Sequence, residues 1–194
     1  FRSEKVGGAV GVHGFQAEVD RTVATSGLYE TGGRAWVRQP DAKVMADLYK
    51  PGEWSEMTVT AVGRYVAVEL NGKKTVELHD DGGRLKGHFA LQLHGGMDMD
   101  VQFKDIEIRR PGPAELAAAG PDGGFAYLFN GKDLAGWQTT GNWLVEKDGS
   151  VTLQPRPGES GWQRYDAYLT TKRTYGDYVL DLEFKFEKGG NSGV

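Results

Sequence analysis

Two carboxylates and one amide alternate along a short segment, GFQAEVD at Gly14 to Asp20, so that Gln16, Glu18 and Asp20 share one side of an extended strand. Alternate residues of a strand lie roughly 6.5 to 7 Å apart on one face. Glu18 and Asp20 could therefore both touch one small ligand and do acid–base chemistry there. Simple solvation of a half-exposed strand is the alternative explanation for this pair.

Two other alternating segments carry polar side chains opposite an apolar face, at His88 to His94 and at Tyr178 to Glu187. If these strands lie with Gly14 to Asp20 in one concave sheet, their polar faces form a single groove. Its predicted lining comprises Gln16, Glu18, Asp20, Gln92, His94, Asp181, Glu183 and Lys185. Solvation is the alternative for Asp181 and Glu183, and a structural hydrogen bond is the alternative for His94.

Arg2 and Asn191 lie near opposite ends of the chain. We expect Phe1 and Val194 to lie on the same strand path, one end continuing the line of the other within a sheet. The reason is that the strands before and after the middle of the chain would each, alone, leave long unpaired edges. With the ends together, Arg2 and Asn191 could reach the rim of the groove. Stabilisation of a loop is the alternative role for both.

Aromatic side chains on the surface of a sandwich can stack on sugar rings, although a buried Trp is more common. Trp36 and Trp162 fall in Gly-rich stretches and are, with Tyr29, the candidate sugar-binding platforms. Trp137 and Trp143 are expected in the core.

The elements that must position these residues are short strands with turns between them. Tyr65 to Leu70 and Lys73 to Leu78 flank Asn71-Gly72, which favours a type I′ hairpin turn. Along Val101 to Ile108 the apolar phase slips near Lys104-Asp105, which predicts a β-bulge. No segment outside Pro111 to Gly124 shows convincing helical periodicity. The pattern predicts an all-β sandwich or jelly roll.

Composition narrows the class of protein. The 194 residues suit one all-β domain, and 29 Gly suit many tight turns. A net charge of -4 with both signs interspersed argues against a nucleic-acid partner. No apolar run is long enough to span a bilayer, and the absence of Cys excludes disulfides and thiolate metal sites.

The order of the segments is unusual. Pro111 to Gly124 is rich in Pro, Gly and Ala and predicts a linker between strand-dense segments at 1–110 and 125–194. We expect the two segments to be the second and first halves of one jelly roll. The chain would then be a circular permutant, or a unit cut from a tandem repeat in mid-repeat.

LFNGKDLAGW, at Leu128 to Trp137, resembles the opening motif of the 3-keto-disaccharide hydrolase domain family. The resemblance continues through the following segments: TYGDYVLDLEFKF at Thr174, GGNSGV at Gly189, Phe1-Arg2, GFQAEVD at Gly14, GLYE at Gly27, LNGK at Leu70, LQLHGG at Leu91 and VQFKDIEIR at Val101. It implies a concanavalin A-like jelly-roll sandwich of two curved antiparallel sheets, circularly permuted. Gln-x-Glu-x-Asp is also similar to the Glu-x-Asp-x-Glu strand of laminarinase-type glycosidases. Gln16 replaces one carboxylate there, which weakens the case for an ordinary two-carboxylate glycosidase.

The resemblance implies an enzyme that cleaves 3-keto-glycosides or 3-keto-disaccharides by base-assisted elimination and hydration. Our candidates are His94 or Glu18 as base, Arg2 or Lys185 as oxyanion stabiliser, and Asp20 as partner or acid. Substrate binding is assigned to Gln16, Gln92, Tyr29, Trp36, Trp162 and Asn191. No metal ligand is assigned, although a divalent metal such as calcium is left open.

Two alternatives remain at this point, a non-catalytic, lectin-like carbohydrate-binding module and a structural module of a larger surface protein. The expected partner is an oligosaccharide or oxidised glycoside, without nucleic acid or a membrane span. We favour a monomer over a domain-swapped dimer. The family implies an extracellular or periplasmic location.

Overall fold

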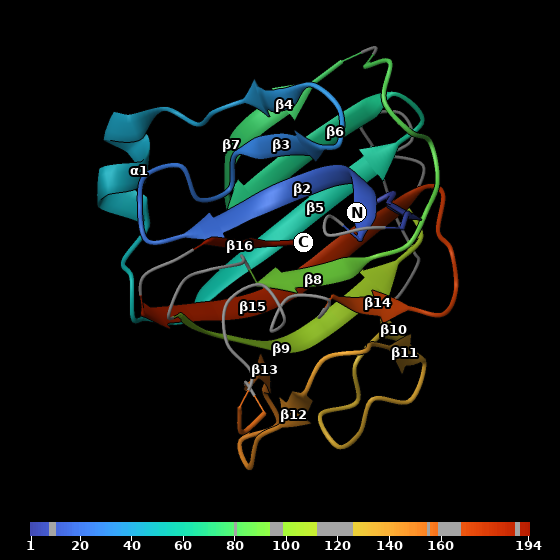
Figure 1. Cartoon of the computed structure of the whole chain (residues 1–194). Coiled ribbons are helices and arrows are strands. Elements are labelled where there is room, and N and C mark those ends of the chain that lie inside the picture. Colours follow the sequence, from blue (N-terminus) through green and yellow to red (C-terminus); the bar gives the residue numbers. More distant parts are fainter. Residues whose placement is uncertain are drawn as a thin grey trace.

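The alternating segments form antiparallel strands in the computed structural model, which describes residues 1–7, 11–79, 81–93, 99–111, 126–154, 156–158, 168–188 and 191–194 (Figure 1). The elements in chain order are β1 (Glu4–Lys5), β2 (Val12–Asp20), β3 (Leu28–Thr31), β4 (Ala35–Arg38), α1 (Ala42–Leu48), β5 (Ser55–Val62), β6 (Tyr65–Leu70), β7 (Lys73–Leu78), β8 (Ala90–Leu93), β9 (Asp100–Arg109), β10 (Ala126–Tyr127), β11 (Trp137–Gln138), β12 (Trp143–Val145), β13 (Val151–Leu153), β14 (Leu169–Thr171), β15 (Tyr178–Lys188) and β16 (Asn191–Gly193).

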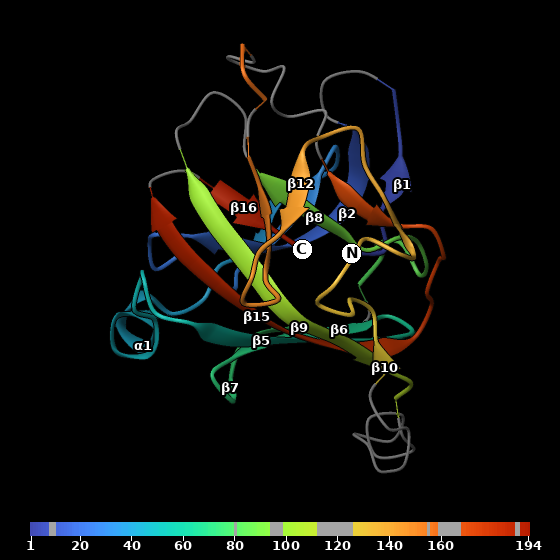
Figure 2. The same ribbon diagram turned by 90° about the horizontal axis from the view of Figure 1, so that it is seen from below.

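Two antiparallel sheets pack face to face, each with eight strands among the described residues (Figure 2). The first sheet runs in the order β11-β14-β8-β16-β2-β3-β4, with β1 paired to β2. The second sheet runs in the order β12-β13-β9-β15-β5-β6-β7, with β10 paired to β9. The predicted fold class is confirmed, since the chain is a nearly all-β sandwich consistent with a jelly roll. Each sheet takes strands from both sides of residues 112–125.

Apolar residues at alternate positions fill the space between the sheets, as the period of a half-buried strand requires. Phe15, Ala17 and Val19 of β2 face this core and are at most 3% exposed. Leu180, Leu182 and Phe184 of β15, in the other sheet, face the same core and are each at most 1% exposed. Trp137 and Trp143, expected in the core, are buried there as well.

Two local predictions are confirmed. Asn71 and Gly72 join β6 to β7 with positive φ at both residues, 49° and 74°. Between Lys104 and Glu107, β9 has one residue more than its partner β15, and Asp105 there has a φ of 48°. This is the predicted bulge, and the extra residue keeps Phe103 and Ile106 both facing the core.

The prediction of no helix outside the linker was wrong, because α1 spans Ala42–Leu48. Asp41 caps it by accepting hydrogen bonds from the backbone N–H groups of Lys43 and Val44. Only Met45 of this helix is buried, so the amphipathic signal is weak and the Pro40-Asp41 start was the usable clue. No helix in the described part of the chain has the length and apolar character that crossing a membrane requires.

Both ends of the chain lie beside β2 and close together (Figure 1), as expected. Val194 and Ala17 exchange backbone hydrogen bonds of 2.8 and 3.0 Å. The terminal amine of Phe1 donates to the carbonyl oxygen of Phe15 at 2.6 Å. The predicted linker falls almost wholly outside the described residues, since 112–125 are not among them.

Candidate functional site

A buried polar cluster lies on the face of the first sheet that is turned away from the core. Gln16 is its centre, and its Nε2 donates to both carboxylate oxygens of Glu18 at 3.2 Å and to Oε1 of Gln92 at 2.8 Å. Its Oε1 accepts a hydrogen bond of 3.1 Å from the hydroxyl of Thr31. Three strands, β2, β3 and β8, therefore supply one connected set of polar groups. We call Gln16, Glu18, Thr31, Gln92 and Tyr168 the Glu18 cluster.

Gly193 makes the contact between Gln16 and Gln92 geometrically feasible. It lies on β16, between β2 and β8, and pairs with Glu18 on one side and Gln92 on the other. A Cβ at this position would lie 2.3 Å from Cγ of Gln16. The absence of a side chain therefore lets the amide of Gln16 cross the narrow β16 and reach β8.

Burial changes the acid–base behaviour of Glu18, which is only 2% exposed. Desolvation, helped by the nearby charge of Asp20 and opposed by the hydrogen bond from Gln16, raises the pKa of Glu18 to about 8. Glu18 thus exchanges its proton near neutral pH, where a general base or acid is most effective. Such a perturbed carboxyl in a polar cluster is a candidate catalytic group.

Tyr168, the fifth member of this cluster, was missed in the sequence. A hydrogen bond joins it to Gln92, and burial raises its pKa to about 12, so its phenol keeps the proton at neutral pH. A space of about 10 Å³ beside it, lined also by Gln16, Gln92 and Thr31, has room for about one water molecule. Thr31 could have been found from its period-two spacing to Tyr29, whereas Tyr168 precedes a strand too short to show alternation.

An aromatic platform lies on the same face beside the cluster. Tyr29 is the cross-strand partner of Gln16 and also of Trp36, whose ring centroid is 5.5 Å away. Trp36 is 41% exposed. Asp20 lies two residues beyond Glu18 and accepts a hydrogen bond from the backbone N–H of Thr22, so it also holds the turn that follows β2.

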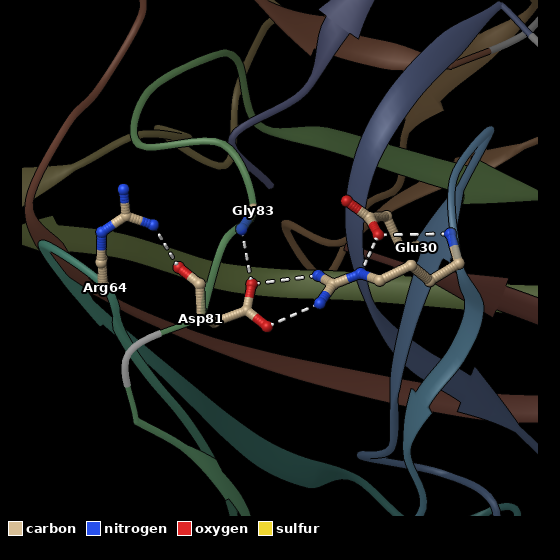
Figure 3. Close-up of polar contacts among 5 residues, drawn as sticks. Glu30, Arg64, Asp81 and Gly83 are labelled. Carbon is tan, nitrogen blue, oxygen red and sulfur yellow. Dashed lines mark hydrogen bonds and ion pairs between the residues drawn. The ribbon is translucent and has the colours of Figure 1, made fainter.

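The β3–β4 hairpin that carries the aromatic platform is anchored through Glu30 and Asp81 (Figure 3), which both form ion pairs with Arg34. Arg34 forms ion pairs with Glu30 and, through both terminal nitrogens, with the carboxylate of Asp81 at 2.7 and 3.0 Å. Asp81 also accepts from the backbone N–H of Gly83, and its carbonyl accepts from Arg64. The network ties the hairpin to the loop after β7, which belongs to the second sheet.

The expectation that Asp181, Glu183 and Lys185 share the groove was wrong. They lie on β15 of the second sheet, on its solvent-facing side, and the core separates them from Glu18. Glu183 forms an ion pair of 2.9 Å with Lys104, and Lys185 lies 5.2 Å from the ring centre of Trp54. Alternation defines the two faces of a strand but does not say which sheet the strand joins.

Arg2 does not reach the rim of the groove either, because it is 1% exposed inside the sandwich. Its Nη1 donates to the carbonyl oxygens of Gly63 at 2.7 Å and Arg84 at 3.3 Å. Its Nη2 contacts Asp177 and the carbonyl of Gly176, both at 3.4 Å. These partners make Arg2 a bridge between the N-terminal segment and the turns of the second sheet.

Three candidates are not placed by these contacts. His94 and Trp162 lie outside the described residues, and for Asn191 only the backbone in β16, opposite Asp20, is described. Within the described ranges, no group of three or more His, Cys, Asp or Glu side chains is arranged to hold a metal ion.

In a comparison with known protein families, residues 1–109 and 124–194 match the 3-keto-alpha-glucoside-1,2-lyase-like domain. A search of curated proteins found no match. The matched residues include the strands of both sheets and every member of the Glu18 cluster.

Proposed function

Because the chain belongs to the 3-keto-alpha-glucoside-1,2-lyase-like domain family, we propose that it cleaves 3-keto-glycosides by base-assisted elimination and hydration. The family name indicates an enzyme that acts on carbohydrates. The single observation that carries the finer proposal is the buried Glu18, whose pKa of about 8 suits a base that works near neutral pH. His94 is the alternative base.

The ketone at C3 of such a sugar acidifies the hydrogen on C2. Glu18 takes this proton, the C1–O bond breaks, and its electron pair leaves with the glycosidic oxygen, which gains a proton. The product is a C1=C2 enone. Water then adds its hydroxyl to C1 and a proton to C2, which restores a 3-keto-sugar. No carboxylate nucleophile is required, in keeping with Gln16 in place of a carboxylate at the first position of the Gln-x-Glu-x-Asp segment.

The charge that develops on the C3 oxygen needs a hydrogen-bond donor. Arg2 and Lys185 lie away from Glu18, so we assign this role to Tyr168. Its raised pKa, about 12, keeps the phenol protonated throughout the working range. Gln16 and Gln92 hold the cluster together, and Asp20 raises the pKa of Glu18 by its charge.

Solvent deuterium tests the reaction directly. A 3-keto-disaccharide is incubated with the protein in D₂O, and the released 3-keto-sugar is analysed by NMR. Elimination and hydration predict one deuterium at C2 in each product molecule, because the proton removed from C2 is replaced from solvent. A no-enzyme control corrects for slow exchange. Cleavage without deuterium at C2 would contradict the mechanism.

The pH dependence of kcat/KM should follow the ionisation of Glu18. Only the carboxylate can remove a proton, and the pKa of Glu18 is raised to about 8 from its ordinary 4.5. We therefore expect kcat/KM to rise about tenfold per pH unit below about pH 7, to reach half its maximum near pH 8 and to level off above about pH 9, since this parameter reports the free enzyme. Short initial-rate assays limit alkaline decay of the substrate. A plateau that already begins near pH 5 would contradict the assignment.

The aromatic platform of Tyr29 and Trp36 favours a second candidate, a lectin-like carbohydrate-binding module. An exposed Trp beside hydrogen-bonding amides is a common sugar-binding surface. Glycan binding without any turnover of 3-keto-sugars would support this function over the enzyme.

A further inference from the structure

A hollow of about 390 Å³ opens on the first sheet, between β1–β2 on one side and β11–β14 on the other. Its described lining includes Lys5, Gln138, Thr139, Thr140, Tyr168 and Thr170. The volume falls in the range of small-ligand sites. Glu18 and Gln16 are not among the described lining residues, so the hollow is separate from the centre of the Glu18 cluster. We call it the Thr pocket.

The charges around the Thr pocket are positive. Lys5 lines it, and no carboxylate is among its described lining residues. Successive side chains of a strand point to opposite faces. The neighbouring Glu4 accordingly turns away from the pocket and pairs with Arg84 at 2.7 Å. A second cation lies beside the pocket, because Nη2 of Arg156 donates to the carbonyl oxygen of Thr140 at 3.2 Å. The pocket is thus a positive region in a chain whose net charge is -4.

Neutral groups in the wall add hydrogen-bond donors. Thr139 accepts a hydrogen bond of 3.0 Å from the backbone N–H of Gly141, which leaves its own O–H to donate. Nε2 of Gln138 donates one N–H to the carbonyl oxygen of Thr171 at 3.4 Å and carries a second N–H. The hydroxyl of Thr170 donates to the carbonyl oxygen of Gln138 at 3.1 Å, which joins β14 to β11 and fixes this wall. Donors therefore come from both sides of the pocket.

We propose that the Thr pocket binds a small organic oxyanion, a carboxylate or a phosphate ester, with Lys5 and the hydroxyl of Thr139 as donors to its oxygen atoms. Hydrogen bonds from a cation to an oxyanion are shorter and roughly twice as strong as neutral ones. A neutral ligand gains no such bond from Lys5, and a cationic ligand is repelled by Lys5 and Arg156. This site does not depend on the proposed function, since it uses no group that we assign as base.

Titration calorimetry of the whole chain with glucose 6-phosphate, glucuronate and glucose tests the inference. The three probes share a hexose ring and differ in charge, so contacts of the ring cancel in the comparison. We expect at least one charged probe to bind about tenfold more tightly than glucose, because the oxyanion adds a charge-assisted hydrogen bond. The comparison of the two charged probes identifies whether the site prefers a phosphate or a carboxylate.

Variants of Lys5 locate the binding site. Lys5 is exposed, so its substitution should leave the thermal unfolding unchanged. Lys5→Gln should weaken binding of the charged probe about tenfold and leave binding of glucose within about twofold. Lys5→Glu should weaken it further, because a carboxylate repels the oxyanion. Lys147→Gln is the matched control, since it makes the same change of charge at an exposed position between β12 and β13 of the second sheet. It should leave the binding of all three probes unchanged.

Charged probes that bind no more tightly than glucose would overturn the inference. Equal losses in Lys5→Gln and Lys147→Gln would overturn it too, since they would show attraction to the overall charge of the protein rather than to the pocket. None of these measurements requires turnover. They therefore give the same answer whether or not the protein cleaves 3-keto-glycosides, and failure of the proposed function leaves this test intact.

Discussion

Replacing Glu18 with Gln should lower kcat for a 3-keto-disaccharide at least ~100-fold, the usual contribution of a general base. The substitution keeps the shape of the side chain and removes only its ability to take a proton. Because burial raises the pKa of Glu18 to about 8, the wild-type side chain is mostly neutral at pH 7, and a neutral Gln fits the same surroundings. We therefore expect the thermal unfolding of E18Q to match that of the wild type at pH 7.

Glu183→Gln is the matched control for this prediction. Glu183 lies on the second sheet, about a third of its side chain is exposed, and it pairs with Lys104 at 2.9 Å. Its substitution should change kcat by no more than about twofold, since changes at exposed pairs are usually small. A Glu18→Gln enzyme that keeps the wild-type rate would move the base to another residue, of which His94 is the first to test by His94→Ala.

Replacing Arg2 with Ala should lower the free energy of unfolding by about 2 to 4 kcal/mol, because each buried acceptor left without its donor costs about 1 to 3 kcal/mol. Arg2 is 1% exposed and donates to carbonyl oxygens of Gly63, Arg84 and Gly176. Loss of the guanidinium leaves these acceptors without their partner inside the sandwich. Arg2→Lys should recover part of the stability, because one ammonium group cannot span the separate acceptors. Urea denaturation measures both effects.

Arg84→Ala is the control, since the side chain of Arg84 is 41% exposed and pairs with the exposed Glu4. It should cost no more than about 0.5 kcal/mol. Turnover provides a second readout for Arg2. If Arg2→Lys keeps full stability but loses activity, Arg2 would act in catalysis after all, against its buried position.

The local pattern was sufficient for several features of the fold and of the site. Alternation predicted most of the strands, Asn71-Gly72 predicted its hairpin, and the slipped phase before Ile106 predicted the bulge. The same alternation placed Gln16 and Glu18 on the face of β2 opposite Phe15 and Ala17. These predictions depend only on backbone geometry and on the period of a pleated strand, which neighbouring residues in the chain determine.

Only the tertiary structure decided which of the polar faces meet. Glu183 and Glu18 have the same local pattern, yet β15 pairs with β5 and β9 whereas β2 pairs with β16 and β3, so the two carboxylates lie on opposite sheets. Sheet membership depends on pairing between distant segments, which alternation does not encode. Burial also depends on distant segments. The raised pKa of Glu18 comes chiefly from its desolvation. Arg2 is buried by its contacts with turns more than 60 residues away in the chain. The sequence by itself thus determined the strands, the family and the faces that could do chemistry. The packing of the two sheets decided that Glu18 would meet Gln16, Gln92 and Tyr168, because hydrogen bonding and desolvation depend on neighbours in space.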